Sequence, residues 1–170
     1  YQKEYSKASD TEINQLISEQ LQAISDIYPL LSDRLEGLKK RLSEAMRSNL
    51  ETLNDMEAHS SLSPFACEHE FWWDMDLGKQ QLCLHGFIDR IDANDDFMRI
   101  IDYKSSKKTM SETDFCAGLQ LQLCAYALYA YEKWGKRMLG AFYYSLKKEN
   151  INGEAGKLKR RPVAYIPMDK

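Results

Sequence analysis

The sequence lacks the features that mark several classes of protein. Its four cysteines form neither a Cys-x-x-Cys pair nor a close cluster with histidine, which argues against a structural zinc site and a disulfide framework. We therefore expect buried free thiols in a reducing compartment, the cytoplasm. No apolar run approaches the length of a bilayer span, so we expect neither a transmembrane helix nor a membrane partner.

A large excess of positive charge is also missing. The chain has 23 basic and 26 acidic residues and a net charge of −3, whereas nucleic-acid-binding domains are typically basic. This argues only mildly against nucleic acid, because a bound metal ion adds positive charge that the sequence does not count. Basic residues do gather in clusters, which are most often solvated faces, at 39–41, 104–108, 147–148 and 157–161.

The composition is that of a globular protein. Of the 170 residues, 44% are hydrophobic and 29% are charged, which suits a single folded core. The sequence does not begin with Met, and we expect it to be a segment of a longer polypeptide. We expect an N-terminal helical segment at 1–60 that packs on a core at 61–170.

Residues 10–57 have the periodicity of helices. Asp10 is a candidate N-cap, and Pro29 divides the segment into two helices. Their apolar stripe normally packs into the protein's own core, and a docking face for a partner subunit is the alternative. The first helix contributes to the stripe Ile13, Leu16, Ile17, Leu21, Ile24 and Ile27.

Residues 65–104 have the pattern of an antiparallel meander. Strands at 65–77 and 80–92 flank the turn formers Gly78-Lys79, and a strand at 97–104 follows Ala-Asn-Asp-Asp. We expect Asp95 and Asp96 of that turn to face solvent.

The remaining residues predict a helix and further strands. A helix at 115–134 has an apolar face suited to packing across a sheet, and strand-like alternation follows at 136–146. Residues 149–161 form a basic loop, and 162–167 could hold a last short strand. The order of elements is that of an α/β or α+β core. The predicted helical face comprises Leu119, Leu121, Leu123, Ala125, Leu128 and Tyr129.

Two carboxylates and one lysine are expected to converge on the meander. Period-two geometry places Asp102 and Lys104 on one face, and Asp89 of the neighbouring strand would face the same point. Nearby carboxylates repel one another unless a cation lies between them or one of them stays protonated. A hard divalent ion resolves the repulsion, which predicts a Mg²⁺ site of the kind used in phosphodiester cleavage. The alternative is a set of surface charges, with a weak Lys104–Asp102 pair.

Three segments together resemble a known family. They are Gly86-Phe-Ile-Asp89-Arg-Ile-Asp92, Ile100-Ile-Asp102-Tyr-Lys104 and Gly118-Leu-Gln-Leu-Gln122-Leu-Cys-Ala-Tyr126. This ensemble resembles the AddB/RexB-type nuclease domain of helicase–nuclease subunits, in the RecB-like branch of the PD-(D/E)xK superfamily. The resemblance covers about residues 65–147. It implies a restriction-endonuclease-like α/β core, with a mixed central sheet flanked by helices.

The resemblance also implies roles for individual residues. Asp89, Asp102 and Lys104 match the catalytic set, and the backbone carbonyl of Tyr103 would join the two carboxylates around Mg²⁺ or Mn²⁺. Further residues would hold DNA or support the site, and these are Gln122, Tyr126 and, on the strand before Asp89, Glu70 or its neighbour Glu68.

The family implies partners as well. A single DNA strand would reach an exonuclease site from a helicase partner subunit during double-strand-break repair. The iron–sulfur cluster of some relatives has no matching cysteines here. The family's upstream histidine ligand is also unmatched by His59, His69 or His85, which predicts weak metal binding or inactivity of the isolated segment. The alternatives are a stand-alone RecB-family or CRISPR-adaptation exonuclease and a non-catalytic DNA-clamping module.

Overall fold

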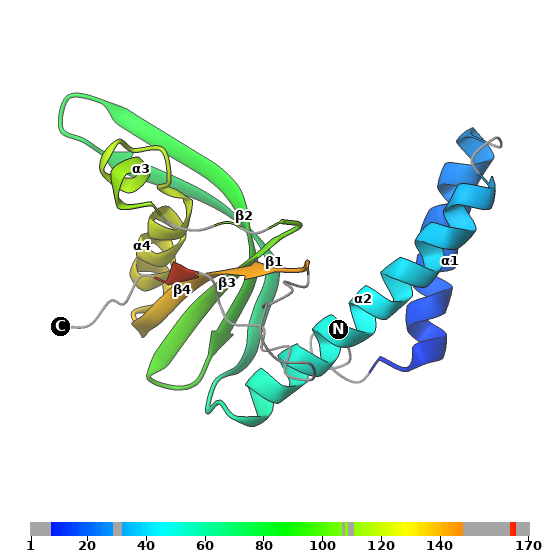
Figure 1. Cartoon of the computed structure of the whole chain (residues 1–170). Helices are drawn as coiled ribbons and strands as arrows, with labels where there is room; N and C mark the ends of the chain where they lie inside the picture. The colour runs from blue at the N-terminus through cyan, green and yellow to red at the C-terminus, as the bar shows by residue number, and fades with distance from the viewer. Residues whose placement is uncertain (1–7, 29–31, 107, 109–110, 148–163, 166–170) are drawn as a thin grey trace. The chain divides into compact units, whose positions relative to one another are not determined.

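The computed structural model describes residues 8–28, 32–106, 108, 111–147 and 164–165. Contacts within the chain separate a helical unit, which ends at His59, from a sheet unit, which begins at Ser60. Figure 1 shows two long helices in the first unit and a sheet with shorter helices in the second. The predicted packing of the first unit on the second stays a prediction.

The helical unit consists of α1 (Asp10–Ile27) and α2 (Ser32–Ala58), close to the predicted bounds. The N-cap of α1 is Ser9 rather than Asp10. The Ser9 hydroxyl accepts from the Glu12 amide, and the Glu12 carboxylate accepts from the Ser9 amide at 2.6 Å, which forms a capping box. A Glu three residues after a Ser therefore decides where the helix begins.

The two helices pack against each other in antiparallel directions. Asp10 pairs with Arg47 at 2.5 Å and Asn14 accepts from Ser43 at 2.8 Å, so positions later in α1 face positions earlier in α2. Ile13, Ile17 and Leu21 are buried in this contact. Of the six predicted stripe residues of α1, the other three, Leu16, Ile24 and Ile27, are exposed. In α2, Leu42 and Met46 are exposed, whereas Leu35, Leu38 and Leu50 pack against the buried cluster.

The sheet unit has a mixed sheet in the order β1-β2-β3-β4-β5. The first three strands form the predicted antiparallel meander, β4 runs parallel to β3, and β5 is antiparallel to β4. The connection between the parallel strands includes α4, which covers one face of the sheet (Figure 1). The strands are β1 (Ser63–Asp76), β2 (Gln81–Ala93), β3 (Phe97–Lys104), β4 (Arg137–Ser145) and β5 (Ala164–Tyr165).

The turn between β2 and β3 fixes their register. The Asn94 side chain accepts from the amides of Asp96 and Phe97 at 3.0 and 2.8 Å, which closes the turn locally. Asp95 and Asp96 are exposed, as predicted. Pairing then runs from Ala93 opposite Met98 to Arg90 opposite Ile101. Because register decides which side chains share a face, this turn determines which residues can meet further along the strands.

The predicted helix at 115–134 is wrong in its first part. The chain forms a short α3 (Glu112–Cys116), then turns at Gly118, whose φ is +75°, and enters α4 at Gln122–Trp134. A left-handed backbone conformation suits glycine and ends a helix. Leu119 and Leu121 are 74% and 50% exposed, so they do not belong to a buried helical face. Their even spacing has the period of a strand rather than that of a helix.

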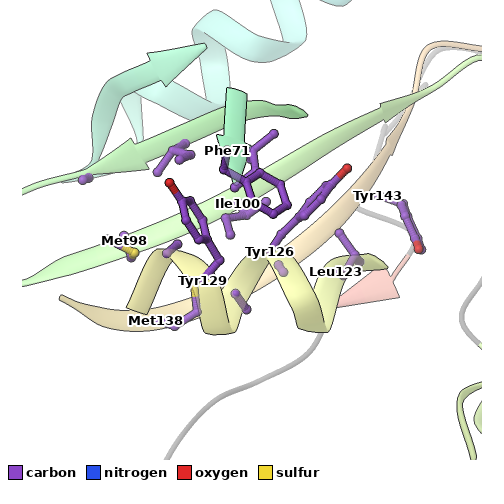
Figure 2. Packing of buried hydrophobic residues seen from close by; sticks show 14 residues of the cluster. Phe71, Met98, Ile100, Leu123, Tyr126, Tyr129, Met138 and Tyr143 are labelled. Atoms are coloured by element: carbon purple, nitrogen blue, oxygen red, sulfur yellow. The ribbon is translucent and has the colours of Figure 1, made fainter. Parts of the chain in front are cut away.

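The core of the sheet unit lies between α4 and the sheet (Figure 2). Phe71 from β1 stacks on Tyr129 of α4 at 4.5 Å between ring centroids and meets Tyr126 edge-on at 5.7 Å. Gly86 of β2 leaves room for this packing, because a Cβ there would lie 3.1 Å from the Phe71 ring. Aromatic rings thus connect the outer hairpin to the helix that follows the third strand.

The cysteines differ from expectation. None of the four, all of which are described, forms a disulfide, but Cys67, Cys83 and Cys116 are exposed and Cys124 is half-buried, so the prediction of buried thiols is wrong. Each exposed cysteine lies outside the ring-lined core described above.

Within the described ranges, every helix is too short or too polar to cross a bilayer.

Candidate active site

Asp89 and Asp102 face each other where β2 and β3 separate. Their positions continue the register by one step beyond the last paired residues, Arg90 and Ile101, and directly opposite residues project to the same face. At this step the Asp89 carboxylate, rather than the β2 backbone, accepts from the Tyr103 amide at 2.6 Å. The Asp89 charge also acts to raise the pKa of Asp102. The two carboxylates therefore lie on neighbouring positions of one face, and their role as metal ligands stays a prediction.

Asp102 is a buried carboxylate with incomplete compensation. Its Oδ2 lies 2.6 Å from the Lys104 ammonium, while only 2% of the side chain is exposed. Apart from this ion pair, Oδ2 has no assigned hydrogen-bond partner among the described residues. Burial raises the pKa of Asp102, and the Lys104 charge opposes that rise. The predicted Asp102–Lys104 contact is present, but it is buried at the carboxylate rather than on the surface.

Lys104 is oriented from α4. Its ammonium donates to Gln122 Oε1 at 3.2 Å, and Gln122 Nε2 donates to the Tyr126 hydroxyl at 2.9 Å. Gln122 and Tyr126 therefore share a helix face, as their spacing predicts. The Tyr126 phenol carries a pKa raised by burial, and the charges of Asp102 and Asp89 act on it in the same direction. A chain of hydrogen bonds thus leads from the helix to the lysine beside the carboxylates.

A second charge cluster lies on neighbouring positions of the same two strands. Asp92 is fully buried, and its two oxygens accept from Arg90 at 2.6 Å and from Arg99 at 2.8 Å. The Arg90 guanidinium and the Asp92 carboxylate form an ion pair at 2.6 Å. Because each carboxylate oxygen has its own guanidinium donor, this cluster has the character of a structural clamp between β2 and β3.

The structure does not bring Glu70 to the carboxylates. Its side chain is exposed and pairs with His85 at 2.9 Å, and the His85 ring stacks on Trp72 at 3.9 Å between centroids. Glu68 is also exposed and has a φ of +47°, a conformation that non-glycine residues rarely adopt. Among the described contacts, neither glutamate supports the site, so an exposed glutamate is the better interpretation for both.

Sequence reasoning did not single out Tyr143, and it included Lys108 only as a member of the basic cluster at 104–108, one of the two that the resemblance places near DNA. Tyr143 lies on β4 directly opposite Asp102, and the ammonium groups of Lys104 and Lys108 lie 5.5 and 5.1 Å from its ring centroid. Alternation of apolar residues predicted that Tyr143 lies on a strand. The parallel pairing of β3 with β4, which places Tyr143 beside Asp102, could not be deduced from that alternation.

The residues present fit a hard divalent cation. Mg²⁺ in nuclease and phosphotransfer sites is typically held by one or two carboxylates together with water and substrate oxygens. Asp89 and Asp102 supply two carboxylates, and the buried Oδ2 of Asp102 lacks a hydrogen-bond donor among the described residues. Within the described part of the chain, no three side chains among His, Cys, Asp and Glu gather in a metal-binding group. The donor set is thus a carboxylate pair, sufficient for Mg²⁺ but not for an all-protein cage.

A family comparison agrees with this arrangement. The sequence model of the PD-(D/E)XK nuclease superfamily matches residues 1–166. This range includes the N-terminal helices, which the motif-bearing segments alone do not reach. The mixed sheet with flanking helices is the restriction-endonuclease-like fold that the sequence predicted.

Three curated relatives are each named as a subunit of an ATP-dependent helicase/deoxyribonuclease. The protein of Listeria innocua is 35% identical over 109 residues, which is 57% of this chain and 9% of the relative. The protein of Moorella thermoacetica is 30% identical over 142 residues, which is 72% of this chain and 12% of the relative. The protein of Thermoanaerobacter is 27% identical over 172 aligned positions, which is 94% of this chain and 14% of the relative. The chain thus corresponds to a small part of these relatives.

Proposed function

The chain belongs to the PD-(D/E)XK nuclease superfamily, and on that premise we propose that it hydrolyses phosphodiester bonds of DNA with Mg²⁺ or Mn²⁺. The observation that carries the proposal is the meeting of Asp89, Asp102 and Lys104 where β2 and β3 separate. A carboxylate pair beside a held ammonium suits a reaction in which negative charge builds on a phosphate. A surface salt bridge would not require the buried, unsatisfied oxygen of Asp102.

Each residue has a distinct task in this mechanism. Asp89, Asp102 and the backbone carbonyl of Tyr103 would hold the cation, which when bound supplies Lewis-acid polarisation of the phosphate. Lys104 donates a hydrogen bond and a positive charge to the phosphate oxygens as the transition state forms. Gln122 keeps the Lys104 ammonium in place, and Tyr126 keeps Gln122 in place. These supporting contacts limit the positions that the lysine can adopt.

The names of the relatives supply a biological setting for the proposal. We place this chain as the exonuclease domain of a cytoplasmic helicase–nuclease that processes DNA ends for recombination and repair. A partner motor subunit would deliver a single strand to the site. The chain covers 9% to 14% of the three relatives described above, which leaves ample length for motor regions in a protein of that kind.

Cleavage of a labelled single strand by the full-length protein tests the proposal. We expect cleavage with Mg²⁺ or Mn²⁺ and none with EDTA. Lys104→Ala should slow cleavage by about 10²- to 10³-fold, the usual cost of removing one donor to a developing charge, while DNA binding persists. Lys133→Ala is the matched control, because Lys133 also lies over a tyrosine ring, that of Tyr129.

Two outcomes would change the conclusion. A Lys104→Ala protein that cleaves at the wild-type rate would remove Lys104 from the mechanism. A wild-type protein that binds DNA but shows no metal-dependent cleavage would favour the non-catalytic clamping module instead.

A further inference from the structure

Tyr143 is a buried residue without an evident structural partner for its hydroxyl. The side chain is 1% exposed, and its hydroxyl oxygen has no hydrogen-bond partner in the described part of the chain. It projects from β4 beside Leu123, at the end of α4 where Gln122 begins the helix (Figure 2). Leaving a buried hydroxyl unsatisfied is costly, by about 1–3 kcal/mol. The part of Tyr143 that its charged neighbours contact is the ring rather than the hydroxyl.

Two lysines approach the ring of this tyrosine. The Lys104 and Lys108 ammonium groups lie 5.5 and 5.1 Å from its centroid, within the range of cation–π attraction. Lys108 is also near enough to Asp102 for its charge to oppose the rise in the pKa of that carboxyl group. Two like charges that share a neighbour repel each other, and the negative face of the ring offsets part of this repulsion. Tyr143 therefore allows two ammonium groups to stay close to the carboxylate pair.

We propose that Lys108 is a second phosphate-contacting residue of this site and that Tyr143 is the positioning residue which holds Lys104 and Lys108 for two phosphates of one strand. The proposal rests on the function proposed above. Its ligand class follows from charge: two carboxylates offset two ammonium groups, and a divalent cation at Asp89 and Asp102 would leave both ammonium groups uncompensated. A ligand with more than one negative charge then fits best, and a nucleic-acid backbone presents such charges in series.

The salt dependence of DNA binding by the full-length protein tests the role of Lys108. A labelled single strand is titrated in Ca²⁺, which takes the same oxygen ligands as Mg²⁺, between 50 and 200 mM salt. Each lysine–phosphate contact contributes about 0.7 to the slope of log affinity against log salt concentration for single strands. Lys108→Gln should lower the slope by about that amount, so that this change in salt weakens wild-type binding about threefold more than variant binding.

Lys133→Gln is the matched control for charge and for ring contact. Its ammonium lies 5.6 Å from the Tyr129 ring, at the C-terminal end of α4, whereas Gln122 lies at the N-terminal end. We expect its slope to equal that of the wild type. An unchanged slope in Lys108→Gln, or an equal fall in both variants, would overturn the assignment of Lys108.

The role of Tyr143 is tested by changing the ring without changing its shape. Tyr143→Phe keeps the negative face and should retain the wild-type slope and affinity. A fluorinated phenylalanine at 143, which removes that face, should weaken binding roughly two- to fivefold, the equivalent of a partly exposed cation–π contact. Both variants keep an aromatic ring at position 143, and circular dichroism checks that the two proteins fold alike. Equal affinity for the two rings would remove Tyr143 from the proposal.

This experiment separates the inference from the function on which it rests. The slope is measured without turnover, whereas the function is measured as cleavage with Mg²⁺. A protein that cleaves DNA while Lys108→Gln keeps the wild-type slope refutes only the inference. A protein that never cleaves but shows the expected change in slope refutes only the catalytic function, and one that binds no strand refutes both.

Discussion

Asp92 and Asp102 are both buried carboxylates on the central strands, but their surroundings differ. Each oxygen of Asp92 accepts from its own arginine, Arg90 or Arg99. Asp102 has a single lysine beside it, and its Oδ2 has no aligned donor among the described residues. Burial raises the pKa of Asp102. One carboxylate is thus fully compensated within the fold, and the other is left with capacity for a further positive partner.

The difference separates a structural ion cluster from a functional one. A buried charge that serves stability is matched by donors in the folded chain, because an unmatched charge is costly. A buried charge that binds a ligand must keep some of its hydrogen-bonding and charge-pairing positions open for that ligand, and this lowers the stability of the folded protein. The two clusters lie a few residues apart on the same strands, so local composition does not distinguish them. The two clusters are distinguished by whether each carboxylate oxygen of Asp92 and Asp102 has a hydrogen-bond donor.

The largest expected effect is on activity, at Asp102. Asp102→Asn should reduce metal-dependent cleavage on the order of 10³-fold or more, as removal of a central catalytic group does. Its free energy of unfolding should change by less than about 1 kcal/mol, because losing a desolvated charge offsets losing the Lys104 pair. Initial rates and urea unfolding measure the two quantities. Asp95→Asn, in the exposed turn, is the control. A loss of stability beyond about 3 kcal/mol would make Asp102 a structural residue like Asp92.

The opposite result is expected at Asp92. Asp92→Asn leaves Arg90 and Arg99 buried without their full counter-charge, which should lower the free energy of unfolding by about 3–5 kcal/mol. Urea unfolding at neutral pH measures this change. Cleavage per folded molecule should stay within a fewfold of wild type, since Asp92 contacts the arginines rather than Lys104. If stability is unaffected, the contrast between the two carboxylates fails.

A smaller effect is expected at Gln122. Gln122→Ala frees the Lys104 ammonium from its α4 contact, and the loss of such a supporting contact typically costs about 10- to 100-fold in activity. Steady-state kinetics should show the loss in kcat with little change in KM. Gln120→Ala is the matched control, because Gln120 bonds to Ser111 and Asp114 instead. If both variants lose the same activity, the effect would come from the loop before α4 rather than from Lys104.

The smallest expected effect concerns His69, a half-buried residue of β1 whose ring stacks on Tyr129. Burial, followed by the Lys133 charge, lowers its pKa below the ordinary 6.5. As pH falls, His69 therefore binds a proton more readily in the unfolded chain than in the folded protein. The free energy of unfolding is highest above pH 6.5 and decreases as pH falls from 6.5 through the lower pKa of the folded protein. Urea unfolding at pH 5 to 8 should show this loss in the wild type and a weaker one in His69→Gln. His59→Gln, at an exposed histidine, should behave as wild type.

Much of the sheet could be predicted because its information is local. Turn formers indicate the hairpins, and alternation indicates which residues share a face, so Asp89, Asp102 and Lys104 could be brought together from the sequence. Gln122 and Tyr126 followed from helical spacing. The motifs and their order then indicated the family, and the family implied the mixed sheet.

The remaining features depend on contacts distant in sequence. The predicted helix at 115–134 starts too early because Leu119 and Leu121 are counted in its apolar face, although the chain turns at Gly118 after α3. The role expected for Glu70 rested on its neighbours in the chain, but its partner is His85 on the next strand. Tyr143 meets Lys104 only because β4 returns parallel to β3, and that pairing requires a crossover whose register no local pattern specifies.

Gly86, the first residue of the motif that contains Asp89, has an effect that extends beyond its own strand. A methyl group at this position would press on the Phe71 ring at 3.1 Å and approach the Tyr126 ring at 3.9 Å. Tyr126 anchors Gln122, and Gln122 anchors Lys104. Because Gly86 has no side chain, Phe71 and Tyr126 can pack close to its backbone. This packing affects the position of the Lys104 ammonium through Tyr126 and Gln122, although Gly86 is not among the hydrogen-bond partners of Lys104.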